Sequence, residues 1–191
     1  MILEKLKADT FEIHKEVEKD NLAKFIMDES ITQTQYEILL RQNFKVYKAV
    51  EDFVNSHYDI LPQELKAFTG YEKTNRLAKD INSFSNLPLP QPYKIASNRD
   101  LATVIGLLYV IEGSMLGGMM MSKKIQSCAH LSHIDTHHFY HSNVKESAAR
   151  WKNFKAVLTS ITFSDQESEN AVASAMKTFS LFQESYKSKN I

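Results

Sequence analysis

Turn-forming residues are scarce in this chain, which has only five glycines and four prolines among 191 residues. A β-rich protein of this length normally needs many more, because tight turns depend on glycine and proline. Leu, Lys, Glu, Ala and Gln are frequent instead, and these residues favour long helices. We therefore predict an all-α protein, a compact multi-helix bundle forming a single domain over residues 1–191.

The charge balance and the single cysteine restrict the binding partners and the cellular compartment that we expect. Lys+Arg and Asp+Glu both number 23, and the pI is about 7.1, so electrostatics do not favour nucleic-acid or anionic-membrane binding. The longest apolar run, Leu101–Ile111, is shorter than the roughly 20 residues of a membrane span. Cys128 alone fits a reducing compartment, and the N-terminus has no signal-type apolar core. We expect a cytoplasmic protein that binds neither nucleic acid nor a membrane.

Apolar residues recur at the three-four spacing of a helix face in six segments. Two segments have capping-box patterns, Thr34 with Glu37 and Ser164 with Glu167. The prolines of NLPLPQPY, residues 86–93, predict an extended loop between helices. The expected helices cover about residues 3–20, 34–57, 62–84 with an interruption at Gly70, 101–125, 144–161 and 164–186.

His14 belongs to the apolar face of the first expected helix. At about 100° per residue it lies about 20° from the direction of Leu3. On this feature alone, a buried histidine satisfied by a neighbour is favoured, but neutral imidazole is also the commonest metal ligand. Glu18, one turn further on, could accept a hydrogen bond from the second ring nitrogen. Both interpretations stay open at this point.

Three glycines interrupt the helical pattern of residues 101–125: Gly113, Gly117 and Gly118. Each costs about 1 kcal/mol relative to alanine inside a helix, so something must offset them. One explanation is close helix packing through the G-x-x-x-G pair. The other is close approach of the backbone to a flat ligand, with a kink that opens a cleft. Met119–Met121 follow, and such pliable apolar residues suit pocket walls as well as cores.

A histidine-rich stretch, CAHLSHIDTHHFYH, follows this segment and suggests a zinc site. Its spacing matches no zinc finger, ribbon or H-E-x-x-H pattern. We therefore interpret it as a polar loop between two helices. The residues concerned are Cys128, His130, His133, His137, His138 and His141.

Four segments together point to a family. They are LKADTFEIHKEVE (6–18), YVIEGSMLGG (109–118), the stretch 139–154 with AARWKNF, and ENAVASAMKTF (169–179). In this order the first two resemble the proximal-helix and distal-helix signatures of bacterial haem oxygenases, and the last two support them. The resemblance covers nearly the whole chain and is nearest to the biliverdin-producing, bacteriophytochrome-associated type. It implies the helical bundle of that family.

The resemblance also implies a chemistry. Haem b would be both substrate and cofactor, with dioxygen as co-substrate, and the products would be biliverdin, carbon monoxide and ferrous iron. Electrons would come from a separate ferredoxin or reductase, since the chain has no flavin- or nucleotide-binding fingerprint. A bacteriophytochrome is the implied receiver of biliverdin.

The resemblance assigns roles to individual residues. His14 would be the proximal iron ligand, with Glu18 hydrogen-bonded to its second nitrogen. The three glycines would pack against the distal haem face and leave a position open for dioxygen. Ser114 stands where many relatives carry an aspartate, and Met119 where they often carry Gln or Arg. The remaining expected haem contacts are Lys7, Tyr109 and Arg150, with Lys7 and Arg150 as partners of the propionates.

Two other classes of function compete with this one. A haem-binding protein without turnover would need the same His14. A haem-independent enzyme on the same scaffold would be either a non-haem di-iron oxidase or a thiaminase-like enzyme. The first needs converging carboxylates and histidines, for which only His14 and Glu112 are candidates. The second needs a catalytic cysteine, and Cys128 has no evident base beside it.

Overall fold

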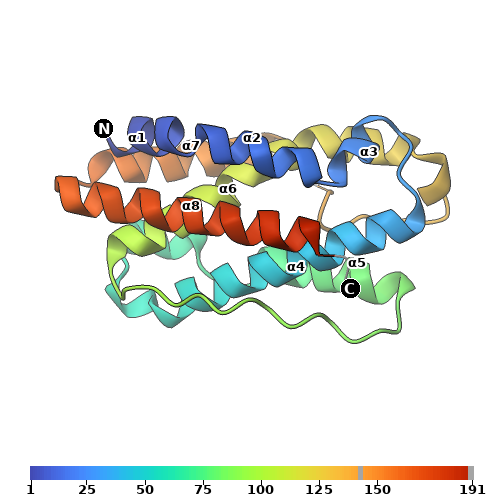
Figure 1. The fold of residues 1–191 in the computed structure, drawn as a ribbon, viewed down its shortest axis with the longest axis horizontal. Coiled ribbons are helices and arrows are strands. Elements are labelled where there is room, and N and C mark those ends of the chain that lie inside the picture. The colour runs from blue at the N-terminus through green and yellow to red at the C-terminus, as the bar shows by residue number, and fades with distance from the viewer. Residues whose placement is uncertain (142–143, 189–191) are drawn as a thin grey trace.

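The computed structural model describes residues 1–141 and 144–188 and is helical, with no strand among these residues (Figure 1). The prediction of an all-α bundle is confirmed. Residues 189–191, the end of the expected domain, lie outside the described part. The α-helices are α1 (Ile2–Asp9), α2 (Phe11–Asp20), α3 (Ala23–Met27), α4 (Gln33–Ser56), α5 (Glu72–Phe84), α6 (Leu101–Lys124), α7 (Val144–Ser160) and α8 (Asp165–Lys187).

Helix α6 occupies the centre of the bundle and packs most extensively against α8. Gly106 makes this possible, because a Cβ added there would lie 2.1 Å from the carbonyl oxygen of Ala171 and 2.8 Å from Ser174 Cβ. Ser174 also donates a hydrogen bond of 2.9 Å to the carbonyl of Thr103. The two backbones are therefore in direct contact at Gly106.

The apolar character of α6 continues past Ile111. By length and composition, Leu101–Ser127 is the one stretch of the described residues that could cross a membrane. Half of its most apolar window is buried inside the bundle, which accounts for that composition as that of a core helix.

The first expected helix forms as two pieces that meet at Thr10. The Thr10 hydroxyl donates to the carbonyl of Leu6 at 2.7 Å, a side-chain-to-backbone bond of the kind that bends helices. The amide of His14 still donates to the carbonyl of Thr10 at 3.0 Å, so the helical register continues to His14.

One of the two predicted capping boxes is wrong. The pair at the start of α4 is Thr32 with Gln35, because the Gln35 amide donates to Thr32 Oγ1 (3.2 Å) and the Thr32 amide to Gln35 Oε1 (2.9 Å). The sequence pattern at Thr34 is displaced by two residues from the true helix start. The box formed by Ser164 and Glu167 at the start of α8 is confirmed.

The expected helix of residues 62–84 forms only in its second half. Residues 63–68 are a 3₁₀ helix, and α5 begins after Gly70, whose φ of 100° is unfavourable for other residues. The Gly70 amide and carbonyl are both bonded to the Asn55 side chain. The short helix α3 was not predicted, because five residues are too few to show a helical period.

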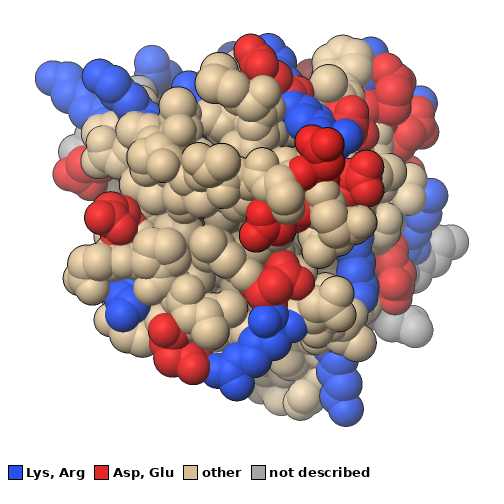
Figure 2. All heavy atoms as spheres, turned by 90° about the vertical axis from the view of Figure 1, so that its left-hand side faces the viewer, with Lys and Arg blue, Asp and Glu red and all other residues tan. Residues whose placement is uncertain are grey.

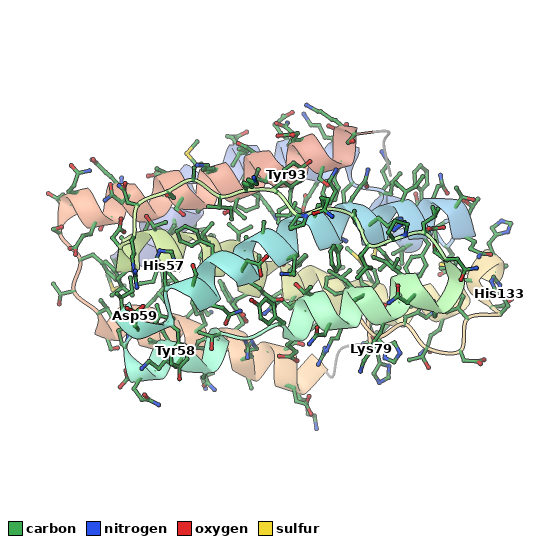
Figure 3. The ribbon with its side chains drawn as sticks, turned by 90° about the horizontal axis from the view of Figure 1, so that it is seen from below. His57, Tyr58, Asp59, Lys79, Tyr93 and His133 are labelled. Carbon is green, nitrogen blue, oxygen red and sulfur yellow. The ribbon has the colours of Figure 1, made fainter. Side chains whose placement is uncertain are left out.

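The proline-rich segment is extended, as predicted, and crosses the underside of the molecule between α5 and α6 (Figures 1 and 3). The Arg41 guanidinium donates to the carbonyl of Pro88, and the Tyr93 amide to the carbonyl of Lys45 at 3.2 Å. These bonds connect the proline-rich segment to α4 and satisfy backbone groups of the segment that have no helical partner.

The histidine-rich stretch forms the irregular connection between α6 and α7, as predicted. His133 is exposed at the opposite end of the molecule from His57 (Figure 3). His137 is buried with its Nδ1 2.9 Å from the Tyr36 hydroxyl, and burial lowers its pKa. This contact gives His137 a structural role.

Candidate haem site

A cavity of about 600 Å³ lies where α1 and α2 meet α6, α7 and α8. This volume is within the range of small-molecule pockets, and the walls are mainly apolar. We call it the His14 cavity. It is lined by Leu3, Glu4, Lys7, Thr10, Phe11, His14, Tyr109, Val110, Gly113, Ser114, Leu116, Trp151, Lys155 and Phe179.

His14 faces this cavity and is not a buried core histidine. Its side chain is 53% exposed, and its ring meets the edge of Phe179 at 5.4 Å between centroids. His14 Nε2 lies 3.5 Å from Glu18 Oε1. The interpretation of a histidine satisfied inside the core is therefore wrong. The imidazole is open to a ligand and has a carboxylate within reach of one ring nitrogen.

The three glycines of α6 after Ile111 are not packing glycines. An added Cβ would meet Trp151 at 3.5 Å from Gly113, an ordinary contact, and a Met121 methyl at 4.0 Å from Gly117. At Gly118 it would meet nothing within 4 Å. The helix-packing explanation is wrong for these positions, and Gly106 has that role instead. Open space beside a glycine-rich helix is what a flat ligand requires.

Ser114 lines the His14 cavity and also a smaller one of about 60 Å³ behind it. Its hydroxyl donates to the carbonyl of Ile111 at 2.9 Å and lies 2.6 Å from the hydroxyl of Tyr47. Burial raises the pKa of Tyr47, so this phenol stays protonated and donates to Ser114. Gly118 lines the smaller cavity rather than the His14 cavity.

Two lysines, Lys7 and Lys155, line the His14 cavity, and only Lys7 was expected. Arg150 was expected to reach the same ligand, but the structure does not bring it there. Arg150 lies on a separate groove of about 870 Å³ and is bonded to Glu112. Tyr109 lines the cavity as expected, half-buried, with its ring centroid 5.8 Å from that of Trp151.

Sequence reasoning missed several wall residues, because their spacing is that of ordinary core positions. Trp151 and Phe179 follow the apolar faces of their helices, and periodicity does not distinguish a packed core from a cavity wall. Phe11 carries the clearest local signal, because it is a large apolar side chain that lies off the apolar face and is exposed.

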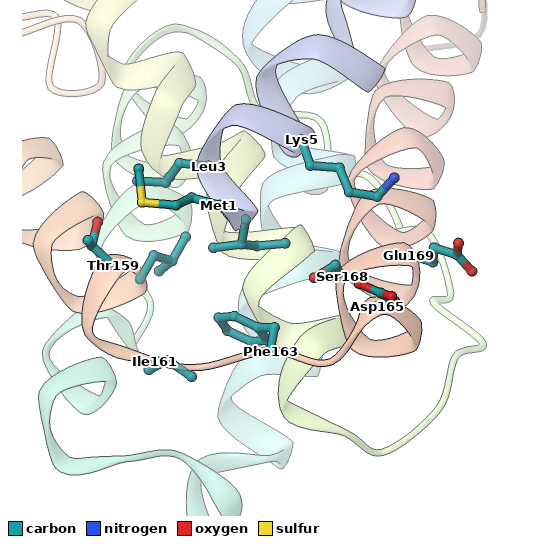
Figure 4. Close-up of a pocket in the computed structure, with 11 residues that line it drawn as sticks. Met1, Leu3, Lys5, Thr159, Ile161, Phe163, Asp165, Ser168 and Glu169 are labelled. Carbon is teal, nitrogen blue, oxygen red and sulfur yellow. The ribbon is translucent and has the colours of Figure 1, made fainter.

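A second cavity, of about 450 Å³, lies at the end of the bundle where α1 begins and α7 leads into α8 (Figure 4). It shares Leu3 with the His14 cavity but contains none of the expected site residues. The end face that Figure 2 shows is largely uncharged, with acidic and basic side chains both scattered around it.

The described residues offer little to the haem-independent alternatives. Within residues 1–141 and 144–188, no three His, Cys, Asp or Glu side chains come together as a metal site would require. Cys128 is buried, its sulfur lies 3.6 Å from the Lys124 carbonyl oxygen, and burial raises the pKa of its thiol. An activated nucleophile needs the opposite shift.

Fold and cavity thus define an all-helical protein with a ligand-accessible histidine at an apolar pocket. The family model described as "Heme oxygenase" matches residues 1–188. The chain belongs to the haem oxygenase family.

One curated relative shares part of the sequence, and solved structures share the fold. A haem oxygenase of Xanthomonas campestris pv. campestris (strain 8004) is 37% identical over 81 residues, which is 40% of this chain and less than half (46%) of that protein. A haem oxygenase structure from Leptospira interrogans has a TM-score of 0.74 at 18% identity, covering 97% of this chain and 98% of that one. Haem oxygenase-1 of Synechocystis sp. PCC6803, in complex with haem, has a TM-score of 0.69 at 17% identity, covering 97% and 90%.

Proposed function

We propose that the protein is a haem oxygenase that opens haem b at a meso carbon to give biliverdin, carbon monoxide and ferrous iron. One observation carries the proposal: the half-exposed imidazole of His14 faces a mainly apolar cavity whose α6 wall includes the bare backbone of Gly113. Haem is a flat apolar ring that needs an axial ligand and carries two carboxylates. The His14 cavity offers matching groups for each of these features.

Each wall of the cavity has a part in this reaction. His14 would hold the iron through one ring nitrogen, and Glu18 would orient the other. Lys7 and Lys155 would neutralise the propionates. Bound haem supplies an iron that takes up dioxygen and a ring carbon that is oxidised.

The wall formed by α6 controls what approaches the haem. Gly113 presents only backbone to the His14 cavity, so no side chain at this position would block a small ligand of the haem. Gly118 lines the smaller cavity behind this wall. The Tyr47 hydroxyl, which is hydrogen-bonded to Ser114, keeps its proton beside this wall. Apolar walls keep bulk water away from the reacting atoms.

Electrons must reach the haem from an external donor, for which we propose a ferredoxin or a reductase. We expect the purified protein with haem and NADPH alone to be inert, because the sequence has no nucleotide-binding fingerprint. Adding ascorbate or a ferredoxin–reductase pair starts haem loss, followed at the main visible absorption band of haem. Steady NADPH oxidation coupled to haem loss in the purified chain would contradict this expectation.

We further propose a cytoplasmic protein that delivers biliverdin to a bacteriophytochrome. The support is the run Glu112-Gly113-Ser114, a pattern that the resemblance assigns to the phytochrome-associated branch and also to some pathogen enzymes of the family. Mixing the turnover product with an apo-bacteriophytochrome tests this, and failure of the product to form the photoactive pigment–protein complex would contradict it.

A further inference from the structure

A buried cluster of charges lies behind the wall of the His14 cavity. Glu112 is 1% exposed, and its carboxylate accepts hydrogen bonds from Lys73 Nζ at 2.7 Å and from Arg150 Nε and Nη2 at 2.6 and 2.9 Å. Burial raises the pKa of Glu112, but the two cations more than offset this and leave the pKa below its ordinary value. Glu112 therefore stays ionised near neutral pH, and we call the three side chains the Lys73–Glu112–Arg150 triad.

The triad joins α6 to three other helices. Lys73 is the second residue of α5, and Glu51 of α4 accepts the backbone amides of Lys73 and Thr74 at 3.1 and 3.0 Å. This carboxylate satisfies a helix N-terminus that has no side-chain cap of its own. Arg150, on α7, also donates to the carbonyl of Ala67 at 3.2 Å. Glu112 is thus tied to α5 and α4 on one side and to α7 on the other.

Glu112 lies at the boundary between the buried part of α6 and its more exposed part. Residues 102–112 are all buried except Tyr109, whereas Gly118 alone is buried among residues 113–124. Glu112 is therefore the last firmly packed side chain before the glycine segment. The glycines add little packing of their own, so Glu112, together with the Ser114–Tyr47 hydrogen bond, holds this wall in place.

The same bonds fix the wall opposite the glycines. Trp151 follows Arg150, and its ring would lie 3.5 Å from a Cβ at Gly113. Trp151 and Lys155 both line the His14 cavity from α7. The Arg150–Glu112 pair therefore sets the spacing between these side chains and the α6 backbone.

We propose that the Lys73–Glu112–Arg150 triad is a positioning device that sets the spacing of the α6 and α7 walls, and with it the pose of haem and the meso carbon that is cleaved. This inference rests on the proposed function. Stability alone is a poor reason for such a cluster, because well-packed apolar residues in place of a buried ion pair are often as stabilising. Fixed geometry is what the bidentate arginine fork adds.

The test replaces the triad by apolar residues of similar size, in the variant Lys73→Met/Glu112→Leu/Arg150→Met. Asp80→Asn is the matched control, because Asp80 is also buried, lies on α5 and accepts two backbone amides, but touches neither wall. Trp151 is the only tryptophan in the chain, so its fluorescence reports directly on the α7 wall. Haem affinity, haem-degradation rate and the ratio of biliverdin isomers are measured alongside it.

We expect the triple variant to fold, with red-shifted Trp151 emission, haem affinity weakened about tenfold, slower turnover and a changed isomer ratio. A displacement of about 1 Å can cost about 100-fold in rate, which makes these readouts sensitive. Asp80→Asn should lower the melting temperature without changing emission or isomer ratio. If the triple variant does not fold, Arg150→Lys, which keeps the charge but loses the fork, is judged by the same readouts.

Unchanged emission, haem affinity and isomer ratio in the folded variant would overturn the inference. Equal changes in Asp80→Asn would overturn it too, since the effect would then be general destabilisation. Absence of turnover in the wild type would instead refute the proposed function. The emission and haem-affinity readouts would still decide whether the triad positions the walls.

Discussion

Replacing His14 by alanine abolishes haem degradation and leaves the apo protein folded. The His14 side chain is half exposed, with an edge contact to Phe179 and the approach to Glu18, so its loss costs little folding energy. It is also the one histidine that lines the cavity within the described residues. The apolar walls still bind haem when His14 is absent. Haem affinity is therefore a poor test, and the rate of haem degradation with ascorbate is the measurement to make.

Two controls make the result of His14→Ala specific. His133→Ala removes an exposed histidine that lies at one end of the molecule and does not line the His14 cavity, so it should keep wild-type turnover. Free imidazole, which can occupy the space left by the side chain, should restore part of the activity of His14→Ala. Wild-type turnover of His14→Ala without imidazole would show that the proximal ligand is a different residue.

Adding a methyl group to two glycines of the same helix has opposite effects on the apo protein. In Gly106→Ala the new Cβ meets the Ala171 carbonyl oxygen at 2.1 Å, so α6 and α8 must separate, at a cost of about 1–3 kcal/mol or more. In Gly118→Ala the Cβ enters open space, and removing a mid-helix glycine adds about 0.4–1 kcal/mol of stability. Thermal unfolding of both apo variants measures the difference.

The larger variant Gly118→Leu separates the function of this glycine from its stability. We expect the apo variant to melt within a few degrees of wild type, and haem binding or turnover to be reduced, because the side chain fills the smaller cavity behind Ser114 and displaces the part of the α6 wall that Ser114 forms. A large drop in apo melting temperature with unchanged haem affinity and turnover would show that Gly118 serves packing. The glycine segment would then leave the proposed site.

Helix periodicity predicted most of the fold but not the surroundings of the site. It placed His14 on the inward face of its helix, and that direction is correct. Whether this face meets other side chains or an open cavity depends on α6, α7 and α8, which are distant in sequence. Arg150 and Lys155 show the same limit, since they lie about 140° apart around one helix. The pattern of α7 alone does not say which of them faces the His14 cavity.

Local sequence patterns do not predict the start of a helix when a side chain distant in sequence supplies the capping contact. The start of α5 has no capping side chain because Glu51, a turn from the end of α4, accepts its first amides. The cost of interior glycines correctly marked residues 113–118 as unusual. Only the neighbours of each glycine show that Gly106 serves packing and the later three do not.

Product analysis of a single turnover tests the central claim most directly. The purified wild-type protein is loaded with one equivalent of haem, given ascorbate in air with an iron chelator, and its pigment and headspace gas are analysed. We predict loss of the haem spectrum with formation of biliverdin and an equimolar amount of carbon monoxide. A stable haem complex that survives reductant and air intact would show a haem-binding protein without turnover and would contradict the assignment.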